Sequence, residues 1–269
     1  IASILRCDLS LIISKPEVEL LINQFKISKS ILHYLPFLLT PLSAKTIEHL
    51  PPFEGRKHFI SIGNFLHAPN WDKTLFLKED IWPLIRKELP EAELHVYGAY
   101  CTKKVQQLHN PKKGFIIKGR APNAIKTIQK SRVLLGPLRF GAGLKGKLLD
   151  ALLTGTPSIT TSIGVEGMPG DLPWAGEIAN TPNEIAKQAI LLYKLEKRWN
   201  KAQRNAIDIL EKRFSKNTFI RHFEAKLNYI EDSLAKHRQQ HFFGQILQHN
   251  QLQSTKYMSL WIEEKNKPR

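Results

Sequence analysis

Residues 114–168, GFIIKGRAPNAIKTIQKSRVLLGPLRFGAGLKGKLLDALLTGTPSITTSIGVEGM, alternate short apolar runs with helical patterns. The expected strands are Phe115–Ile117, Val133–Leu135 and Ser158–Thr161. Between them lie two expected helices, Pro122–Lys130 and Lys145–Thr154, and the second is stopped by Gly155. Strands that alternate with helices at this spacing indicate parallel pairing through right-handed crossovers.

The same alternation continues on both sides of this stretch. Three more expected strands are His58–Ile62, Leu94–Tyr97 and the weaker Gly176–Ala179. The further helices are Trp71–Glu88 with a kink or new start at Pro83, Lys103–His109, Pro182–Leu195 and Arg198–Lys212. Six such units predict a doubly wound, Rossmann-like α/β domain over about residues 56–215, with strand order 3-2-1-4-5-6.

The two ends of the chain are less regular. Strands are expected at Cys7–Ser14 and Ile31–Leu35, with a helix at Glu17–Phe25 between them and a linker at Pro41–Glu54. A helix is expected at Thr218–Lys236, and the polar tail from Gln239 receives no assignment. The chain begins at Ile1 rather than Met, and its first residues resemble the middle of a domain, so we expect a fragment.

Composition limits the class of protein. The 269 residues carry 40 Lys and Arg against 24 Asp and Glu, a net charge of +16, and 42% are hydrophobic, enough for a sizeable core. The positive charge is spread along the chain, which disfavours nucleic acid as the partner. No apolar run is long enough for a membrane span. Cys7 and Cys101 lack metal-ligand spacing and predict reduced thiols in a cytoplasmic protein.

A ligand site is predicted where the first and fourth strands lie side by side. In doubly wound sheets, ligands bind beyond the carboxyl ends of the strands at this point. The first strand ends in Gly63 and Asn64, and the fourth in a loop containing Gly141, Ala142 and Gly143. The helix that follows begins near Lys145 and Lys147, a combination suited to a diphosphate. A carboxylate at Asp150, three residues after Lys147, could accept hydrogen bonds from ribose hydroxyls.

Gly141, Gly143 and Gly146 satisfy the G-x-G-x-x-G dinucleotide pattern. That pattern belongs to the first strand–helix turn, however, and here it follows the fourth strand. The next strand, Ser158–Thr161, also ends without an acidic residue for an adenosine ribose. NAD and FAD are therefore disfavoured.

Three segments resemble the GT-B glycosyltransferases of the large glycosyl transferases group 1 family. Residues 59–99, FISIGNFLHAPNWDKTLFLKEDIWPLIRKELPEAELHVYGA, look like the start of the donor-binding domain, and residues 114–168 carry the family's most specific signature. Residues 7–27, CDLSLIISKPEVELLINQFKI, and then HYLPFLL at 33–39 are similar to the end of its acceptor domain.

The resemblance implies one complete doubly wound donor domain and a truncated remnant of a second. Residues 1–50 would be the remnant and linker, residues 51–215 the donor domain, and residues 216–269 a helix that crosses back, with a tail. The helix Thr218–Lys236 would normally pack on the missing domain, although its apolar spacing equally fits an ordinary core helix. The catalytic groups on the acceptor side would lie in the missing part.

The resemblance also assigns residues to a nucleotide diphosphate-sugar. Asp150 would hold the ribose, in place of the family's usual glutamate, and Gly119 and Arg120 would lie near the base. Thr161 through Gly167 would close the far wall. The residues implied on the diphosphate side are Gly63, Asn64, Gly141, Ala142, Gly143 and Lys145 or Lys147. Ala142 stands where the family often has a first glutamate, and Asn64 where it often has arginine.

The expected function is metal- and cofactor-independent transfer of a sugar from a UDP- or GDP-sugar to a saccharide or glycolipid acceptor of the cell envelope. The expected location is the cytoplasm, with peripheral contact to an anionic membrane. Two alternatives stay open: a catalytically incomplete nucleotide-sugar-binding fragment, and a nucleotide-sugar epimerase on the same fold.

Overall fold

The computed structural model describes residues 1–40 and 49–267. These residues form two compact units. Unit 1 comprises residues 1–37 together with the chain from 217 onward, and unit 2 comprises residues 38–216. The predicted linker Pro41–Glu54 falls partly outside the description, because residues 41–48 are not among the described residues.

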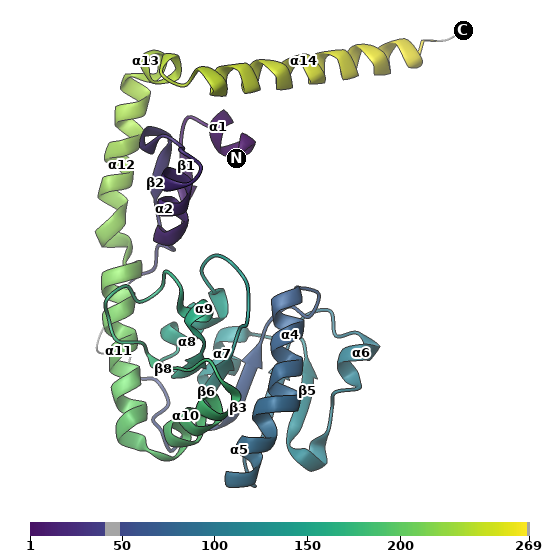
Figure 1. Ribbon diagram of the computed structural model, residues 1–269, viewed down its shortest axis with the longest axis vertical. Helices are drawn as coiled ribbons and strands as arrows, with labels where there is room; N and C mark the ends of the chain where they lie inside the picture. The colour runs from purple at the N-terminus through teal and green to yellow at the C-terminus, as the bar shows by residue number, and fades with distance from the viewer. Residues whose placement is uncertain (41–48, 268–269) are drawn as a thin grey trace. The chain divides into compact units, whose positions relative to one another are not determined.

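Unit 2 is built on a six-stranded parallel sheet (Figure 1). Its strands are β3 (Lys57–Ile62), β4 (Leu94–Tyr97), β5 (Phe115–Gly119), β6 (Ser131–Gly136), β7 (Ser158–Thr160) and β8 (Gly176–Ile178). They are ordered β5-β4-β3-β6-β7-β8, which is the predicted order 3-2-1-4-5-6. β3 and β6 therefore lie side by side, paired through Phe59–Val133 and Ile60–Leu134. The carboxyl ends of these two strands define the switch point of the sheet.

Helices cover both faces of this sheet (Figure 1). Successive residues of a strand point to opposite faces, and accordingly Phe59 and Ile60 belong to two different core clusters. The cluster with Phe59 is completed by α4 (Ala68–Phe76), a π-helical turn (Leu77–Ile81), α5 (Trp82–Glu88) and α10 (Pro182–Lys194). The cluster with Ile60 is completed by α7 (Ala124–Gln129) and α8 (Gly146–Leu153), and α11 (Glu196–Phe214) contributes to both.

Some helices of unit 2 differ from the predicted bounds. The helix predicted over Trp71–Glu88 already begins at Ala68, with Pro69 in its first turn, and a new segment starts at Trp82, next to Pro83. Proline suits a first helical turn because its missing N–H has no partner there. The helix predicted over Lys103–His109 is only one turn, α6 (Lys103–Gln106), and α9 (Ser162–Val165) was not predicted. A short 3-10 turn, Pro111–Lys113, precedes β5.

Unit 1 holds a two-stranded parallel sheet of β1 (Ser10–Ile12) and β2 (Leu32–Tyr34). The strand predicted over Cys7–Ser14 is thus shorter, and α1 (Ala2–Arg6) precedes it. The other elements of the unit are α2 (Lys15–Asn23), a 3-10 turn (Lys29–Ile31), α12 (Lys216–Asp232), α13 (Leu234–Gln239) and α14 (Phe242–Lys265). α12 contacts β2 through aromatic rings: Phe219 lies 5.8 Å from Tyr34, and Phe223 lies 5.7 Å from His33, between ring centroids.

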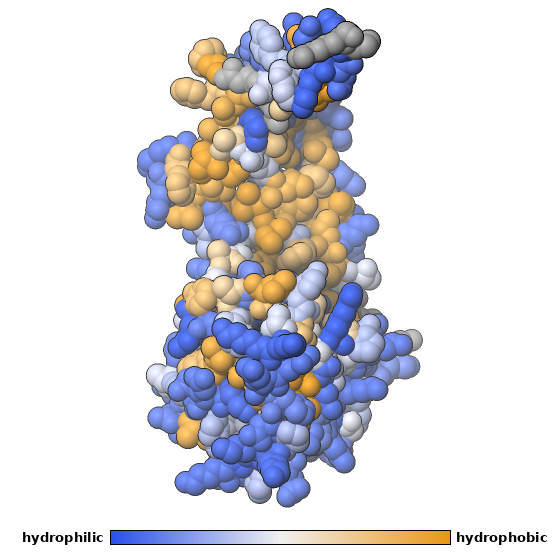
Figure 2. Space-filling view, turned by 90° about the vertical axis from the view of Figure 1, so that its right-hand side faces the viewer, coloured by the Kyte–Doolittle hydropathy of each residue, from blue (hydrophilic) through white to orange (hydrophobic). Residues whose placement is uncertain are grey.

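Unit 1 exposes much apolar surface. Figure 2 shows apolar side chains gathered over this unit, whereas the visible face of unit 2 is largely hydrophilic. Leu11 on β1, Leu20 on α2, and Phe25 and Phe37 in the loops are all exposed. Parallel sheets are ordinarily covered on both faces, whereas this two-stranded sheet leaves Leu11 of β1 exposed. Among the residues that the structure describes, no helix combines the length and apolarity that crossing a membrane requires.

Candidate functional site

The loops after β3, β4 and β5 are hydrogen-bonded to one another at the carboxyl edge of the sheet. Gly63 N–H donates to the Tyr97 carbonyl at 3.1 Å, and Gly98 N–H donates to the Gly119 carbonyl at 2.8 Å. The backbones approach so closely that a Cβ on Gly98 would lie 2.2 Å from the Gly63 carbonyl oxygen. Only glycine therefore fits at position 98, because any larger residue would push the Gly63 turn away from the β4 loop.

Asn70, on α4, connects the β3 loop to α8. Its side chain lies against Gly63, where an added Cβ would be 2.6 Å from the amide. The amide nitrogen donates to the Asn64 carbonyl at 3.0 Å, and the amide oxygen accepts a hydrogen bond from Lys147 Nζ. Asn70, which is not among the predicted site residues, thus brings together the predicted switch-point residues Gly63, Asn64 and Lys147.

Lys147 is a half-buried cation in the first turn of α8. Burial, and then the positive charge of Lys145, lower its pKa from the ordinary 10.5 to about 8. None of the ion pairs found among the described residues includes Lys147. An ammonium group held by an amide oxygen, without a carboxylate, is suited to an anion that comes from solution.

Lys145 has a different environment, although it is only two residues away. Its Nζ donates to the carbonyl oxygens of Gly141 at 3.0 Å, Ala142 at 3.0 Å and Gly143 at 2.5 Å. Gly141 and Gly143 adopt positive φ angles of 127° and 71°, which favour glycine. Lys145 therefore organises the loop that follows β6, and Lys147 is the better placed of the two for a ligand.

A second amine lies behind Asn70. Lys73, one turn further along α4, is 1% exposed, and its Nζ donates to the carbonyl of Ile62, the last residue of β3, at 3.0 Å. Burial lowers the pKa of Lys73 well below 10.5, and the charge of Lys147 lowers it further. Lys73 also takes part in none of the ion pairs of the described residues. Two amines without carboxylates thus flank the Gly63 turn.

The remaining predicted residues surround this centre. Asp150 is half-buried on α8, and burial raises the pKa of its carboxyl group. Thr161 Oγ1 caps α9 by accepting from Gly164 N–H at 3.2 Å and donates to the Leu138 carbonyl, which joins the segment after β7 to the loop after β6. Gly119 ends β5, two strands from β3, and Arg120 after it is exposed.

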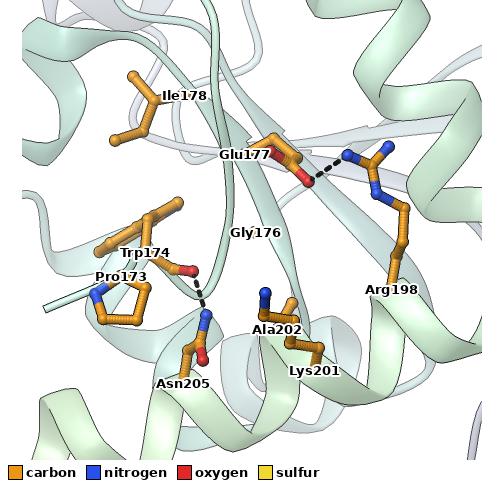
Figure 3. Close-up of a pocket in the computed structure, with 9 residues that line it drawn as sticks. All are labelled: Pro173, Trp174, Gly176, Glu177, Ile178, Arg198, Lys201, Ala202 and Asn205. Carbon is orange, nitrogen blue, oxygen red and sulfur yellow. Dashed lines mark hydrogen bonds and ion pairs between the residues drawn. The ribbon is translucent and has the colours of Figure 1, made fainter.

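Two hollows lie away from the switch point. One, of about 550 Å³, follows the edge strand β8 and α11 (Figure 3). Its polar groups pair within the protein: Arg198 with Glu177 at 3.2 Å, and Asn205 Nδ2 with the Trp174 carbonyl at 2.9 Å. The other, of about 460 Å³, lies between β4 and α7 and is lined by His58 and His95. Neither is lined by Lys73 or Lys147.

Within the described residues, His, Cys, Asp and Glu side chains do not form a group of three that could hold a metal ion. The positive charges at the switch point are those of the lysines and of the exposed Arg139, which pairs with Asp72 on α4.

Comparisons with known proteins place this chain in a family. The family model described as glycosyl transferases group 1 matches residues 56–194, more than half of the chain. The chain belongs to the glycosyl transferases group 1 family, as its sequence predicts. No curated protein matches it.

Solved structures show the same fold. A mutant of S. aureus TarM in complex with fondaparinux, alpha-GlcNAc-glycerol and UDP superposes with a TM-score of 0.67 at 13% identity, over 82% of this chain and 44% of TarM. The pneumococcal O-GlcNAc transferase GtfA, with UDP and GlcNAc, gives 0.61 at 18% identity, over 82% and 45%. Anabaena Alr3699/HepE, with UDP and glucose, gives 0.60 at 12% identity, over 82% and 63%. The chain thus has the fold of part of a GT-B protein and spans less than two thirds of these relatives.

Asn70 and Lys73 were not predicted as site residues. The buried positions of α4 and the π-helical turn are 70, 73, 74, 76, 77 and 81, and most of them follow the helical period. This spacing places Lys73 on the buried stripe and could have revealed it. Because lysine is rarely buried without a partner, a lysine on the buried stripe of a helix indicates a functional residue. The position of Lys73 could have been recognised in this way.

Proposed function

We propose that the carboxyl edge of the unit 2 sheet binds the diphosphate of a nucleotide-sugar and that the protein acts as a glycosyltransferase. The observation that carries the proposal is the buried amine of Lys73 together with the half-buried amine of Lys147, which flank Gly63 without a carboxylate partner. Burying a charge without compensation is costly. A diphosphate at this position would supply the missing negative charge.

Lys147 would contribute most to the chemistry. When the bond between sugar and diphosphate breaks, negative charge develops on the leaving group. A fixed ammonium group stabilises that charge in the transition state, and it does so more strongly in a site that excludes water. Gly141 and Gly143 adopt positive φ angles, and their backbone N–H groups would add dipoles directed at the same anion. The N-terminus of α8 would add a further dipole.

The other assignments extend outward from this diphosphate. Asp150 would accept hydrogen bonds from the ribose hydroxyls, and Gly119 and Arg120 would lie on the side of the base. Thr161 through Gly167, which include α9, would form the far wall. Lys145 would act indirectly, because its amine holds the carbonyls of the Gly141–Gly143 loop.

UDP is the nucleotide to test first. The TarM, GtfA and HepE structures each contain UDP, and their similarity to this chain supports carrying that ligand over as part of the proposal. The sugar would go to a saccharide or glycolipid acceptor, without a metal ion, in the cytoplasm or at its membrane surface. Groups that act on the acceptor would be contributed by a second Rossmann-like domain, of which unit 1 would be a part.

A thermal-shift panel tests the donor site. The purified 269-residue chain is heated with UDP, GDP, ADP or NAD at millimolar concentration. A ligand that binds only the folded state stabilises it by about 2.7 kcal/mol at one hundred times its Kd. We expect UDP or GDP to raise the melting temperature by several degrees and NAD to have no effect. Equal melting temperatures with all four ligands would contradict the proposed function.

A further inference from the structure

Among the described residues, Lys73 donates one hydrogen bond, to the Ile62 carbonyl. A methionine of similar length would fill the same space between α4 and β3 without the cost of burying an amine. The chain instead places a titratable group beneath the turn that carries Gly63. Lys73 is 1% exposed, so a charge on its amine is screened little by water.

The charges around Lys73 are arranged asymmetrically. Lys147, on α8, is the charged side chain among the described residues whose field acts on Lys73. Lys147 is in turn affected by Lys145, which belongs to the loop after β6. On α4 itself, Asp72 pairs with Arg139 and is therefore engaged elsewhere. Lys73 thus faces positive charge with no compensating carboxylate.

Asn70 connects α4, which carries Lys73, to Lys147 on α8. It lies one turn before Lys73 on the same stripe of α4 and accepts a hydrogen bond from Lys147 Nζ. Its side chain lies against Gly63 and its amide donates to the Asn64 carbonyl. An anion that binds beside Lys147 at the Gly63 turn would therefore be separated from Lys73 by Asn70 and the end of β3.

We propose that Lys73 is a positioning residue for the diphosphate, which fixes the end of β3 through Ile62 and takes up a proton when the anion binds beside Lys147. The positive charge of the pair therefore increases when the anion binds. This inference rests on the proposed donor site and adds to it a proton that accompanies binding. The proton comes from solvent, and no covalent bond is formed or broken.

The electrostatic basis is linkage. In the empty site, burial and the charge of Lys147 favour neutral Lys73, since its pKa lies well below the ordinary value. A bound diphosphate brings negative charge and raises that pKa. Because the bound diphosphate raises the pKa of Lys73, it favours protonation of the amine. By linkage, a protonated Lys73 in turn favours binding of the diphosphate. At neutral pH Lys147, with a pKa of about 8, is already mostly charged and contributes little to the uptake.

The test is isothermal titration of the full chain with UDP at pH 7, in two buffers that differ in ionisation enthalpy. The dependence of the heat on the buffer gives the number of protons taken up. We expect Lys73→Met to bind UDP about tenfold more weakly, and to take up roughly half a proton less than the wild type. Lys73→Gln keeps a donor for the Ile62 carbonyl but cannot gain charge, and it should lose the proton uptake as well.

Lys78→Met is the matched control, because Lys78 Nζ also donates to a backbone carbonyl, that of Leu108 at 2.8 Å, away from the Gly63 turn. It should leave affinity and proton uptake unchanged. Proton uptake equal to that of the wild type in both Lys73 variants would overturn the inference, and so would full rescue of affinity by Lys73→Gln.

A second titration with inorganic pyrophosphate separates the two proposals. Binding of pyrophosphate but not of any nucleotide, with uptake that depends on Lys73, would contradict the donor function alone. Failure of the wild type to bind either ligand would overturn both.

Discussion

Replacing Lys147 by methionine is expected to weaken UDP binding by at least tenfold while leaving the fold intact. The side chain supplies a charge-assisted hydrogen bond to the diphosphate, and such bonds contribute about 1.5–3 kcal/mol. Each 1.4 kcal/mol corresponds to a factor of ten in Kd. Removal of a half-buried ammonium group without a carboxylate partner should also raise the melting temperature of the ligand-free protein. Titration calorimetry and thermal unfolding measure the two effects.

The pH dependence of stability and of UDP affinity also tests the role of Lys147. The pKa of Lys147 in the folded chain is about 8, below its ordinary 10.5. The unfolded chain therefore binds more protons between these values, and stability should rise as pH increases from about 8 to about 10.5. Affinity for a diphosphate should fall over the lower part of that window, because the anion requires the charged amine.

Both pH effects should be smaller in Lys147→Met than in the wild type. Lys87→Met, which removes an exposed lysine of α5, serves as the control and should bind UDP normally. Undiminished affinity in Lys147→Met would show that this amine does not contact the ligand.

Replacing Gly98 by alanine is expected to destabilise unit 2 by about 2–4 kcal/mol, since overpacking at a rigid site has costs of this order. The new Cβ would lie 2.2 Å from the Gly63 carbonyl oxygen and 2.5 Å from the ring of Phe65. The backbone oxygen cannot yield as a flexible side chain would, so the β3 and β4 loops must separate. Denaturant unfolding measures the stability, and UDP affinity should fall with it because the Gly63 turn moves.

Gly146→Ala is the matched control for this effect. Gly146 begins α8 in the same region, yet an added Cβ would meet no atom within 4 Å. Alanine favours a helix over glycine by up to about 1 kcal/mol, so this variant should be as stable as the wild type or slightly more so. A Gly98→Ala protein that unfolds at the same denaturant concentration as Gly146→Ala would contradict the steric argument.

Much of unit 2 follows from local sequence patterns. Each of the strands β3 to β7 is a short apolar run, and most of them end near glycine, so their order and parallel direction could be predicted. The Gly63 turn and the loop at Gly141–Gly143 were placed at the switch point by this order alone. The strand order, but not the contacts within the site, is therefore encoded in patterns that can be recognised without a structure.

The site chemistry depended on packing that these patterns do not reveal. Lys145 and Lys147 are equivalent in sequence, but only the structure shows that one amine is bonded to loop carbonyls and the other to Asn70. Lys73 was overlooked because lysines are expected at the surface.

The tail from Gln239 is polar and rich in Gln and His, and for that reason α14 was not predicted. In unit 1, the strand at Cys7–Ser14 was overestimated because apolar residues of a short strand and its flanking loops are alike in composition.

The most direct test of the donor site is a crystal structure of the 269-residue chain grown with UDP. We predict that the diphosphate lies at the carboxyl ends of β3 and β6, with a phosphate oxygen within hydrogen-bonding distance of Lys147 Nζ, and the ribose toward Asp150. UDP bound instead in the hollow along β8 and α11, or in the groove beside His58 and His95, would contradict the proposed donor site.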